Sequence, residues 1–151
     1  ITDAELNIIA EGPDLVIHAH DKILERMNDY VHEMHHRSGL LDEVRKSKIS
    51  IEDAEAQTLD FINKHLGTRY RPPLCGNSIG TDRRFLDMQM ISLERRLHYR
   101  VVDVSSVKEL AIRWYPEIED KMPPKMETHR AFDDIIESIK ELKFYRKNLF
   151  R

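Results

Sequence analysis

Two short β-rich runs, each followed directly by a helical pattern, constrain the fold of this chain most strongly. The first run, residues 74–77, leads through a glycine-containing turn into a predicted helix over 82–97. The second run, residues 98–104, precedes a helix that Ser105 or Ser106 can cap. Because strands alternate with helices, the sequence predicts an α/β fold with helices packed against a sheet.

The other predicted elements are mainly helices. Ser50 can cap a helix with an apolar stripe over residues 51–66, and Gly67 follows as a stop. Near the N-terminus we expect an extended segment with a break over 6–18 and a helix from Asp21 to about Tyr30. The helix that begins after residue 104 should end at Trp114, because Pro116 follows it. A loop over 122–126 and a long helix from Thr128 onward complete the chain.

Composition excludes several classes of protein. The chain has 151 residues and 40% hydrophobic residues, enough for one core, so we expect a single domain over residues 1–151. The 24 Lys and Arg residues stand against 27 Asp and Glu residues, which argues against a polybasic nucleic-acid coat. Cys75 is the only cysteine, so no internal disulfide forms, which suits a reducing compartment. The sequence has no apolar run of the roughly 20 residues that a membrane-spanning helix needs.

Two segments place acidic residues where a ligand site can form. In the segment 76–82, a strand end turns through two glycines and brings Asp82 to the start of a helix. In the segment 129–134, Asp133 shares a helical face with His129, whereas Asp134 lies about 140° away. If His129 lies in the loop before the helix, it can act with Asp134, because carboxylates suit Mg²⁺ or Mn²⁺ and imidazole can deprotonate water. Read alone, each segment also fits an ordinary capped helix start.

Two further patterns resemble metal sites but have simpler explanations. Residues 32–36 match the zinc protease pattern H-E-x-x-H, but Arg37-Ser38-Gly39 ends any helix at once. Asp3 and Glu5 have the spacing of two carboxylates on one side of a strand, but they precede the extended segment. We interpret the first pattern as a chance match and the second as a surface turn.

Three motifs together resemble the oligoribonucleases of the DEDDh exonuclease family. They are Gly76-Asn77-Ser78-Ile79-Gly80-Thr81-Asp82-Arg83-Arg84-Phe85-Leu86, His98 to Leu110 with the sequence HYRVVDVSSVKEL, and His129 to Ser138 with the sequence HRAFDDIIES. The resemblance extends over essentially the whole chain. It implies a ribonuclease H-like fold with a mixed sheet, and removal of nucleoside 5′-monophosphates from the 3′ ends of short oligoribonucleotides.

The resemblance also implies roles for individual residues. Asp82 and Asp134 would be two of four acids that hold two Mg²⁺ or Mn²⁺ ions, and His129 would be the general base. The substrate-binding residues it implies are Ser78, Ser105 and Ser106 at the 5′ phosphate of a dinucleotide, Arg100 and Tyr99 across a homodimer interface, and Tyr30 and His35 at the bases. Tyr30 stands where the family usually has Trp, and any aromatic ring can stack on a base.

One motif of the family has no counterpart in this sequence. The family's first strand, with Asp-x-Glu followed by Met-Thr-Gly, would lie upstream of Ile1, so we expect the domain to be N-terminally incomplete. Two explanations are open: a longer exoribonuclease that was cut, or an inactive relative that binds oligonucleotides or dimerises without cleaving. Residues 114–116 and 144–146 look closer to the eukaryotic branch, which leads us to expect a mitochondrial or cytoplasmic location.

Overall fold

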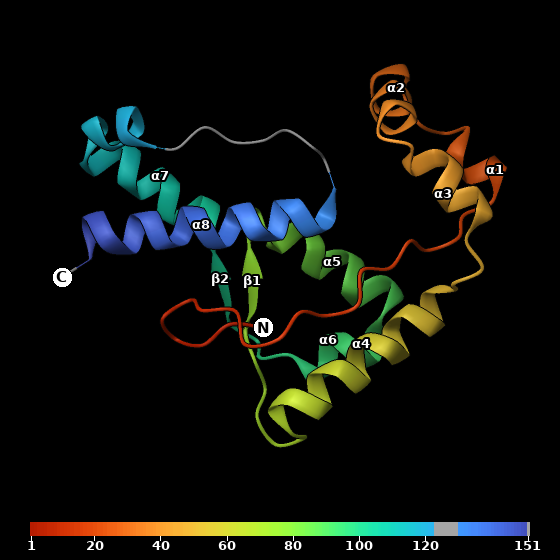
Figure 1. Ribbon diagram of the computed structural model, residues 1–151, viewed down its shortest axis with the longest axis horizontal. Coiled ribbons are helices and arrows are strands. Elements are labelled where there is room, and N and C mark those ends of the chain that lie inside the picture. Colours follow the sequence, from red (N-terminus) through yellow and green to blue (C-terminus); the bar gives the residue numbers. More distant parts are fainter. Residues whose placement is uncertain (123–129, 151) are drawn as a thin grey trace.

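A computed structural model describes residues 1–122 and 130–150, apart from the side chain of Glu119. Its regular elements appear in Figure 1 in the order α1 (Asp21–Leu24), α2 (Asp29–Arg37), α3 (Leu40–Lys46), α4 (Ile51–Leu66), β1 (Leu74–Gly76), α5 (Gly80–Gln89), α6 (Ile91–Arg96), β2 (Val101–Asp103), α7 (Val104–Trp114), the 3-10 helix η1 (Pro116–Lys121) and α8 (Ala131–Leu149). The α/β class predicted from the sequence is confirmed.

The sheet consists of the two β-rich runs. Strands β1 and β2 are parallel, with Leu74 opposite Val101 and Gly76 opposite Asp103. Parallel strands end at the same edge, so the turn after Gly76 and the start of α7 lie side by side. In Figure 1, helix α8 crosses that end of the sheet.

Helix α4 begins and ends where the sequence predicts. The Ser50 hydroxyl accepts a hydrogen bond from the Asp53 backbone N–H, and the Asp53 carboxylate accepts one from the Ser50 N–H, which together form a capping box. Gly67 ends the helix with φ of 65°, a value that glycine adopts without a steric penalty. Inside this part of the molecule, Ile62 of α4 packs with Leu93 and Leu97 in one buried cluster.

The single helix predicted over 82–97 is wrong, because the structure divides it into α5 and α6 at Met90. Met90 has φ of −135° and ψ of 62°, which is not helical. The bend turns α6 onto α4, where Leu93 is buried and its backbone N–H donates to the Glu55 carboxylate at 2.9 Å. Tertiary packing therefore overrides a continuous helical pattern.

The second buried cluster joins α7, η1 and α8. It contains Val104, Ala111, Ile118 and Tyr145, of which Tyr145 is fully buried. Helix α7 ends at Trp114 as predicted, but its N-cap is Asp103, whose carboxylate accepts from the Ser105 N–H at 3.2 Å. The expectation that Ser105 or Ser106 is the cap is thus wrong, because the carboxylate one position earlier takes that role.

The first 50 residues depart most from the predictions. Residues 6–18 form isolated bridges, Thr2 to Ile8 and Ile17 to Ile49, and no strand of the sheet. The helix predicted from Asp21 to Tyr30 is a single turn, α1, followed by a separate helix α2 that Asn28 caps. The loop predicted over 122–126 lies outside the described residues, except for Met122. The described residues resume at Arg130, and α8 begins at Ala131, whereas the sequence predicts a helix from Thr128 onward. None of the described helices combines the length and apolar character needed to cross a lipid bilayer.

Candidate functional site

Two of the three serines predicted to hold a phosphate meet at the edge of the sheet. Ser78 follows β1 and Ser105 lies in the first turn of α7. The Ser78 backbone N–H donates to the Ser105 hydroxyl at 3.0 Å, and the two hydroxyl oxygens are 3.2 Å apart. The third serine, Ser106, donates its hydroxyl hydrogen to the Asp103 carboxylate at 2.6 Å. The parallel pairing of β1 with β2 therefore brings together residues 27 positions apart.

Ser78 has a backbone conformation that is unusual for its residue type. Its φ is 50°, in the left-handed region that costs a residue with a Cβ about 1–2 kcal/mol. A strained backbone of this kind persists only where the surrounding contacts hold it in place, and it is common at ligand sites. Here the contacts are those to Ser105 on one side and the anchored residue Asn77 on the other.

Asn77 connects this turn to helix α8, a role that the sequence analysis missed. Its side-chain oxygen accepts from the Ser105 hydroxyl at 3.1 Å. Its amide nitrogen donates to the Ser138 hydroxyl at 2.9 Å and to the Glu141 carboxylate at 3.2 Å. Glu141 is only 3% exposed, and its other oxygen accepts from the Tyr145 hydroxyl at 3.2 Å. The sequence does contain a signal for this network: Ser138, Glu141 and Tyr145 are three polar residues spaced so that they share one face of a helix.

Of the two predicted carboxylate ligands, one lies on the helix that follows this turn and the other lies on α8, which Asn77 contacts. Asp82 is in the first turn of α5, four residues after Ser78, and Asp134 is in the first turn of α8. The Ser138 hydroxyl, which accepts from Asn77, donates to the backbone carbonyl of Asp134 at 2.8 Å. The first turns of α8 are therefore tied to the loop that precedes α5.

The site contains the donor type that a hard divalent ion prefers, because carboxylate oxygens suit Mg²⁺ and Mn²⁺. Within residues 1–122 and 130–150, however, no three His, Cys, Asp or Glu side chains gather closely enough to hold an ion. The described residues thus provide carboxylates of the right chemistry without a complete set of ligands. His129, the predicted general base, lies outside the described residues.

Tyr30 and His35 both lie on α2, which has no buried residue. Tyr30 is 75% exposed, whereas His35 is partly buried and its Nδ1 has no hydrogen-bond partner among the described residues. Five positions on a helix correspond to a rotation of about 140°, so the two rings leave α2 in different directions. A polar contact joins the neighbouring helix α3 to the segment before α8: the guanidinium of Arg130 donates to the Glu43 carboxylate at 2.7 Å.

Tyr99 and Arg100 form part of an exposed stack in the loop before β2. The His98 and Tyr99 ring centroids are 4.5 Å apart with a 29° angle between the ring planes, and the Arg100 guanidinium carbon is 5.2 Å from the Tyr99 ring centroid. Tyr99 is 71% exposed. An exposed aromatic ring beside a cation can contact a base or a phosphate.

Neither of the alternative metal patterns forms a site. Residues 32–36 do lie within α2, which ends at Arg37 as predicted, but Glu33 is bonded to Arg37 at 2.8 Å and this contact lowers the Glu33 pKa. Asp3 accepts hydrogen bonds from the backbone N–H groups of Glu5 and Asn7, which is the geometry of a surface turn.

The parallel strands end where Ser78 and Ser105 meet, so the fold is that of an α/β protein with a candidate ligand site at the carboxyl edge of its sheet. The family model described as exonuclease matches residues 1–142. The chain is 54% identical to the oligoribonuclease of Mycobacterium bovis (strain BCG / Pasteur 1173P2) over 150 residues, which is 99% of this chain and 70% of that protein. It is 51% identical to the oligoribonuclease of Corynebacterium glutamicum (strain R), over 99% of this chain and 68% of that protein. It is 53% identical to the oligoribonuclease of Rhodococcus jostii (strain RHA1), over 99% of this chain and 75% of that protein.

The chain belongs to the exonuclease family. It is a hydrolase that cleaves the phosphodiester bonds of nucleic acids. The resemblance inferred from the three motifs is thus confirmed. Members of the family generally depend on a divalent metal. The relatives named above are bacterial, so they do not support the expected eukaryotic branch or a mitochondrial location.

Proposed function

We propose that the chain is a 3′–5′ exoribonuclease that degrades short oligoribonucleotides, dinucleotides above all, to nucleoside 5′-monophosphates. The observation that carries the proposal is 54% identity to an oligoribonuclease over 99% of the chain. The hydrogen bonds of the Asn77–Ser78 turn to Ser105 and to Ser138 of α8 support it, because they join residues of all three motifs.

In this proposal, Asp82 and Asp134 hold Mg²⁺ or Mn²⁺ ions, two of them in the complete site. When bound, such ions stabilise the charge that develops on the phosphate during hydrolysis. His129 accepts a proton from the water that attacks the 3′-terminal phosphodiester. The carboxylates at the first turns of α5 and α8 are also favoured there by the helix dipoles.

Substrate recognition in this proposal separates the phosphate from the bases. Ser78, Ser105 and Ser106 bind the 5′ phosphate through their hydroxyls. On binding, the Ser105 and Ser106 hydroxyls exchange their acceptors in the free protein, Asn77 and Asp103, for phosphate oxygens. Arg100 and Tyr99 of a second copy complete that pocket in a homodimer. At the other end, Tyr30 and His35 contact the bases by stacking. Residues 1–151 act as one exonuclease domain, and the location is the cytoplasm.

The adjacent residues Asp133 and Asp134 provide a matched test of the metal assignment. With Mn²⁺ and a 5′-labelled diribonucleotide, we expect Asp134→Asn to lower release of the labelled monophosphate at least about a hundredfold, as loss of a transition-state charge contact does elsewhere. Asp133→Asn is expected to retain activity within about threefold, because Asp133 points away from that face by about 100°. Equal losses in the two variants would contradict the assignment of Asp134.

The same assay separates this function from that of an inactive relative. Release of monophosphate by the unmodified chain supports the exoribonuclease, whereas tight binding of the dinucleotide without release in Mg²⁺ or Mn²⁺ supports a binding module. Failure to bind or cleave the dinucleotide would refute both.

A further inference from the structure

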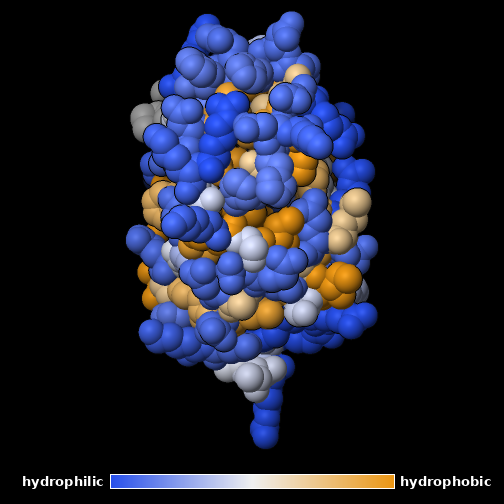
Figure 2. All heavy atoms as spheres, turned by 90° about the vertical axis from the view of Figure 1, so that its right-hand side faces the viewer, coloured by the Kyte–Doolittle hydropathy of each residue, from blue (hydrophilic) through white to orange (hydrophobic). Residues whose placement is uncertain are grey.

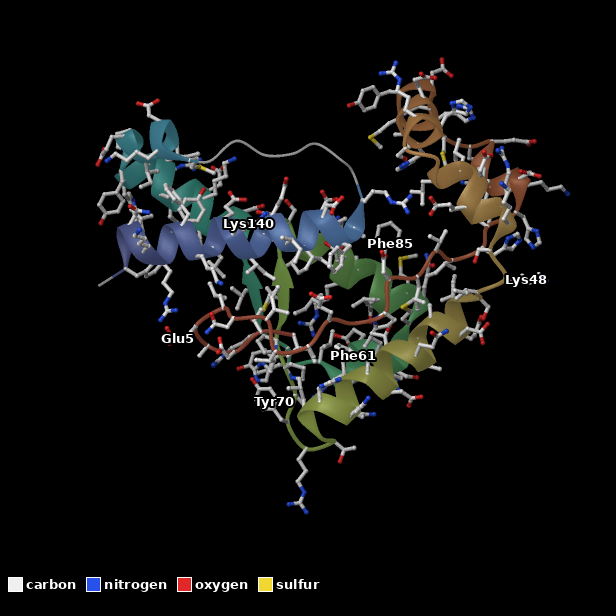
Figure 3. The ribbon with its side chains drawn as sticks, viewed as in Figure 1. Glu5, Lys48, Phe61, Tyr70, Phe85 and Lys140 are labelled. Carbon is white, nitrogen blue, oxygen red and sulfur yellow. The ribbon has the colours of Figure 1, made fainter. Side chains whose placement is uncertain are left out.

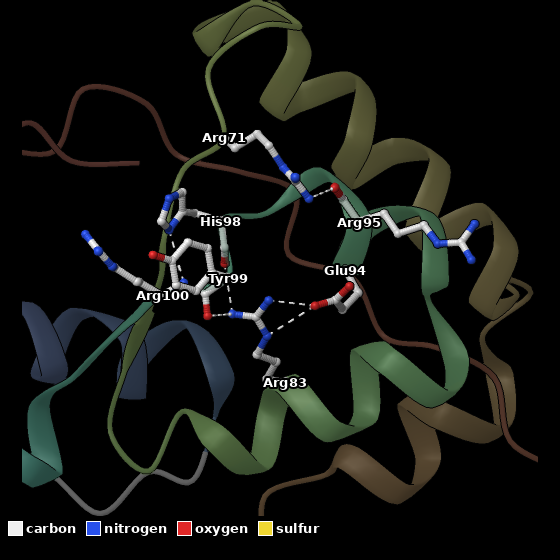
Figure 4. Close-up of polar contacts among 7 residues, drawn as sticks. All are labelled: Arg71, Arg83, Glu94, Arg95, His98, Tyr99 and Arg100. Atoms are coloured by element: carbon white, nitrogen blue, oxygen red, sulfur yellow. Dashed lines mark hydrogen bonds and ion pairs between the residues drawn. The ribbon is translucent and has the colours of Figure 1, made fainter.

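The guanidinium of Arg83 occupies the centre of a polar network outside the proposed metal site (Figure 4). Its Nε and Nη2 donate to one oxygen of the Glu94 carboxylate at 3.2 and 2.6 Å. Its Nη1 donates to the backbone carbonyls of His98 and Tyr99 at 2.9 and 2.8 Å. One side chain on α5 therefore connects α6 to the loop that precedes β2.

Arg83 is well suited to this task because its side chain is largely enclosed. The side chains of Arg83 and Glu94 are 21% and 22% exposed, so solvent screens their interaction less than it screens a surface pair. A planar guanidinium can also direct several N–H groups at once, which a lysine ammonium cannot do in the same fixed geometry. The neighbouring Arg84 is exposed, and its contact is to the Thr81 hydroxyl at 3.5 Å.

The loop that Arg83 holds has an ordered backbone and exposed side chains. The His98 N–H donates to the Pro72 carbonyl at 2.9 Å, and the Arg100 N–H donates to the His98 Nδ1 at 3.1 Å. The partly buried ring of His98 stacks with the exposed side chains of Tyr99 and Arg100, and we name this stack the 98–100 platform. A rigid backbone that displays exposed aromatic and cationic groups is the arrangement that a preorganised binding surface requires.

We propose that Arg83 is a positioning residue that fixes the 98–100 platform for recognition of the 5′ phosphate of a short oligonucleotide. This inference rests on the proposed function, in which Arg100 and Tyr99 complete the phosphate pocket. Arg83 follows Asp82 directly in α5, so one helix turn sets both the carboxylate and, through the two carbonyls, the platform. Because the platform completes the pocket of a second copy, α5 of one copy then supports its own metal site and the phosphate pocket of its partner.

The proposal predicts a selective loss that general destabilisation does not produce. Affinity is measured for two diribonucleotides that differ only in having a phosphate or a hydroxyl at the 5′ end. In Arg83→Gln, the preference for the phosphorylated ligand should fall about tenfold. A change of this size corresponds to the loss of one charge-assisted hydrogen bond between the platform and the phosphate. Arg83→Lys should resemble Arg83→Gln, and Arg84→Gln should keep the preference of the unmodified chain.

Glu94→Gln separates stability from positioning. The substitution removes the negative charge at position 94 but keeps a side-chain oxygen that can accept a hydrogen bond from Arg83. The hydrogen bonds from Arg83 to the His98 and Tyr99 carbonyls also remain. This variant should be less stable in urea unfolding and still retain the phosphate preference. A comparable fall of affinity for both ligands in Arg83→Gln, or an unchanged preference, would overturn the proposal.

Hydrogen exchange tests the anchoring even if the dinucleotide does not bind. The His98 and Arg100 amides should exchange at least about tenfold faster in Arg83→Gln than in Arg84→Gln, while amides in the middle of α4 remain unchanged. Unchanged exchange at His98 and Arg100 would refute the anchoring. Faster exchange together with no binding by the unmodified chain would instead refute the proposed function and leave the anchoring supported.

Discussion

The two ends of the proposed dinucleotide site are built in opposite ways. At the phosphate end, formed by Asn77, Ser78 and Ser105, hydrogen bonds cross between three segments and hold a left-handed backbone. At the base end, formed by Tyr30 and His35, the residues lie on a nine-residue helix with no buried side chain. In Figure 1, α1 to α3 lie at the upper right, away from the strands, and Figure 2 views the molecule from that side, where orange hydrophobic atoms lie between blue hydrophilic ones.

The contact that ties the base end to α8 is correspondingly modest. The side chains of Arg130 and Glu43 are 33% and 45% exposed, and such pairs contribute about 0–1 kcal/mol. Their hydrogen bond raises the pKa of Arg130, so the guanidinium stays charged. The difference between the ends follows the chemistry of the ligand: a phosphate needs donors in fixed directions, whereas base stacking tolerates variation.

The largest expected effect concerns Asn77 at the phosphate end. Asn77→Ala removes three hydrogen bonds, one of them to the buried Glu141 carboxylate, and should lower the free energy of unfolding by about 3 kcal/mol. Urea unfolding measures this change. Asn148→Ala is the control, because Asn148 is exposed near the end of α8 and its loss should cost less than about 0.5 kcal/mol. Similar values for the two variants would show that the phosphate end is not held by Asn77.

The contrast between the ends also explains which parts of the site could be predicted. The sequence predicts roles for Ser78, Ser105, Asp82 and Asp134 because they belong to motifs with fixed spacing, and the structure brings Ser78 and Ser105 into contact. Asn77 lies inside the first motif, but its partners Ser138 and Glu141 are 61 and 64 positions away, and no local pattern reports such pairs. Arg83 also lies inside the first motif, but the motif predicts no role for it, because its partners lie on other elements.

The fold shows the same division between local and distant determinants. Helix α4 was predicted correctly at both ends because Ser50, Asp53 and Gly67 act locally. The break at Met90 was missed because it depends on where Leu93 meets α4, and that contact is distant in sequence. Residues 6–18 have an extended pattern, but extended segments become strands only through pairing, and here the pairing is limited to isolated bridges.

A smaller effect is expected at the base end, and it should appear in binding and not in stability. Tyr30→Ala should weaken oligonucleotide binding by about 2 kcal/mol, the cost of losing one stacked base, while the free energy of unfolding changes by less than about 0.5 kcal/mol. Tyr30→Trp should preserve the affinity. Tyr70→Ala serves as the control, because the Tyr70 ring is 58% exposed in the loop after α4 (Figure 3). A large loss of stability in Tyr30→Ala would contradict the contrast drawn here.

The smallest effect tests the strained backbone of Ser78. Ser78→Ala and Ser78→Gly both remove the hydroxyl that lies 3.2 Å from the Ser105 hydroxyl, but only glycine relieves the left-handed conformation at φ of 50°. Relief of about 1–2 kcal/mol is partly offset by the greater flexibility of glycine in the unfolded chain, about 0.5–1 kcal/mol. Ser78→Gly should therefore be more stable than Ser78→Ala by about 1 kcal/mol in urea unfolding, although both lose the hydroxyl offered to the 5′ phosphate. If Ser78→Ala is the more stable of the two, the turn relaxes out of the left-handed region, and the phosphate end is no more preorganised than α2.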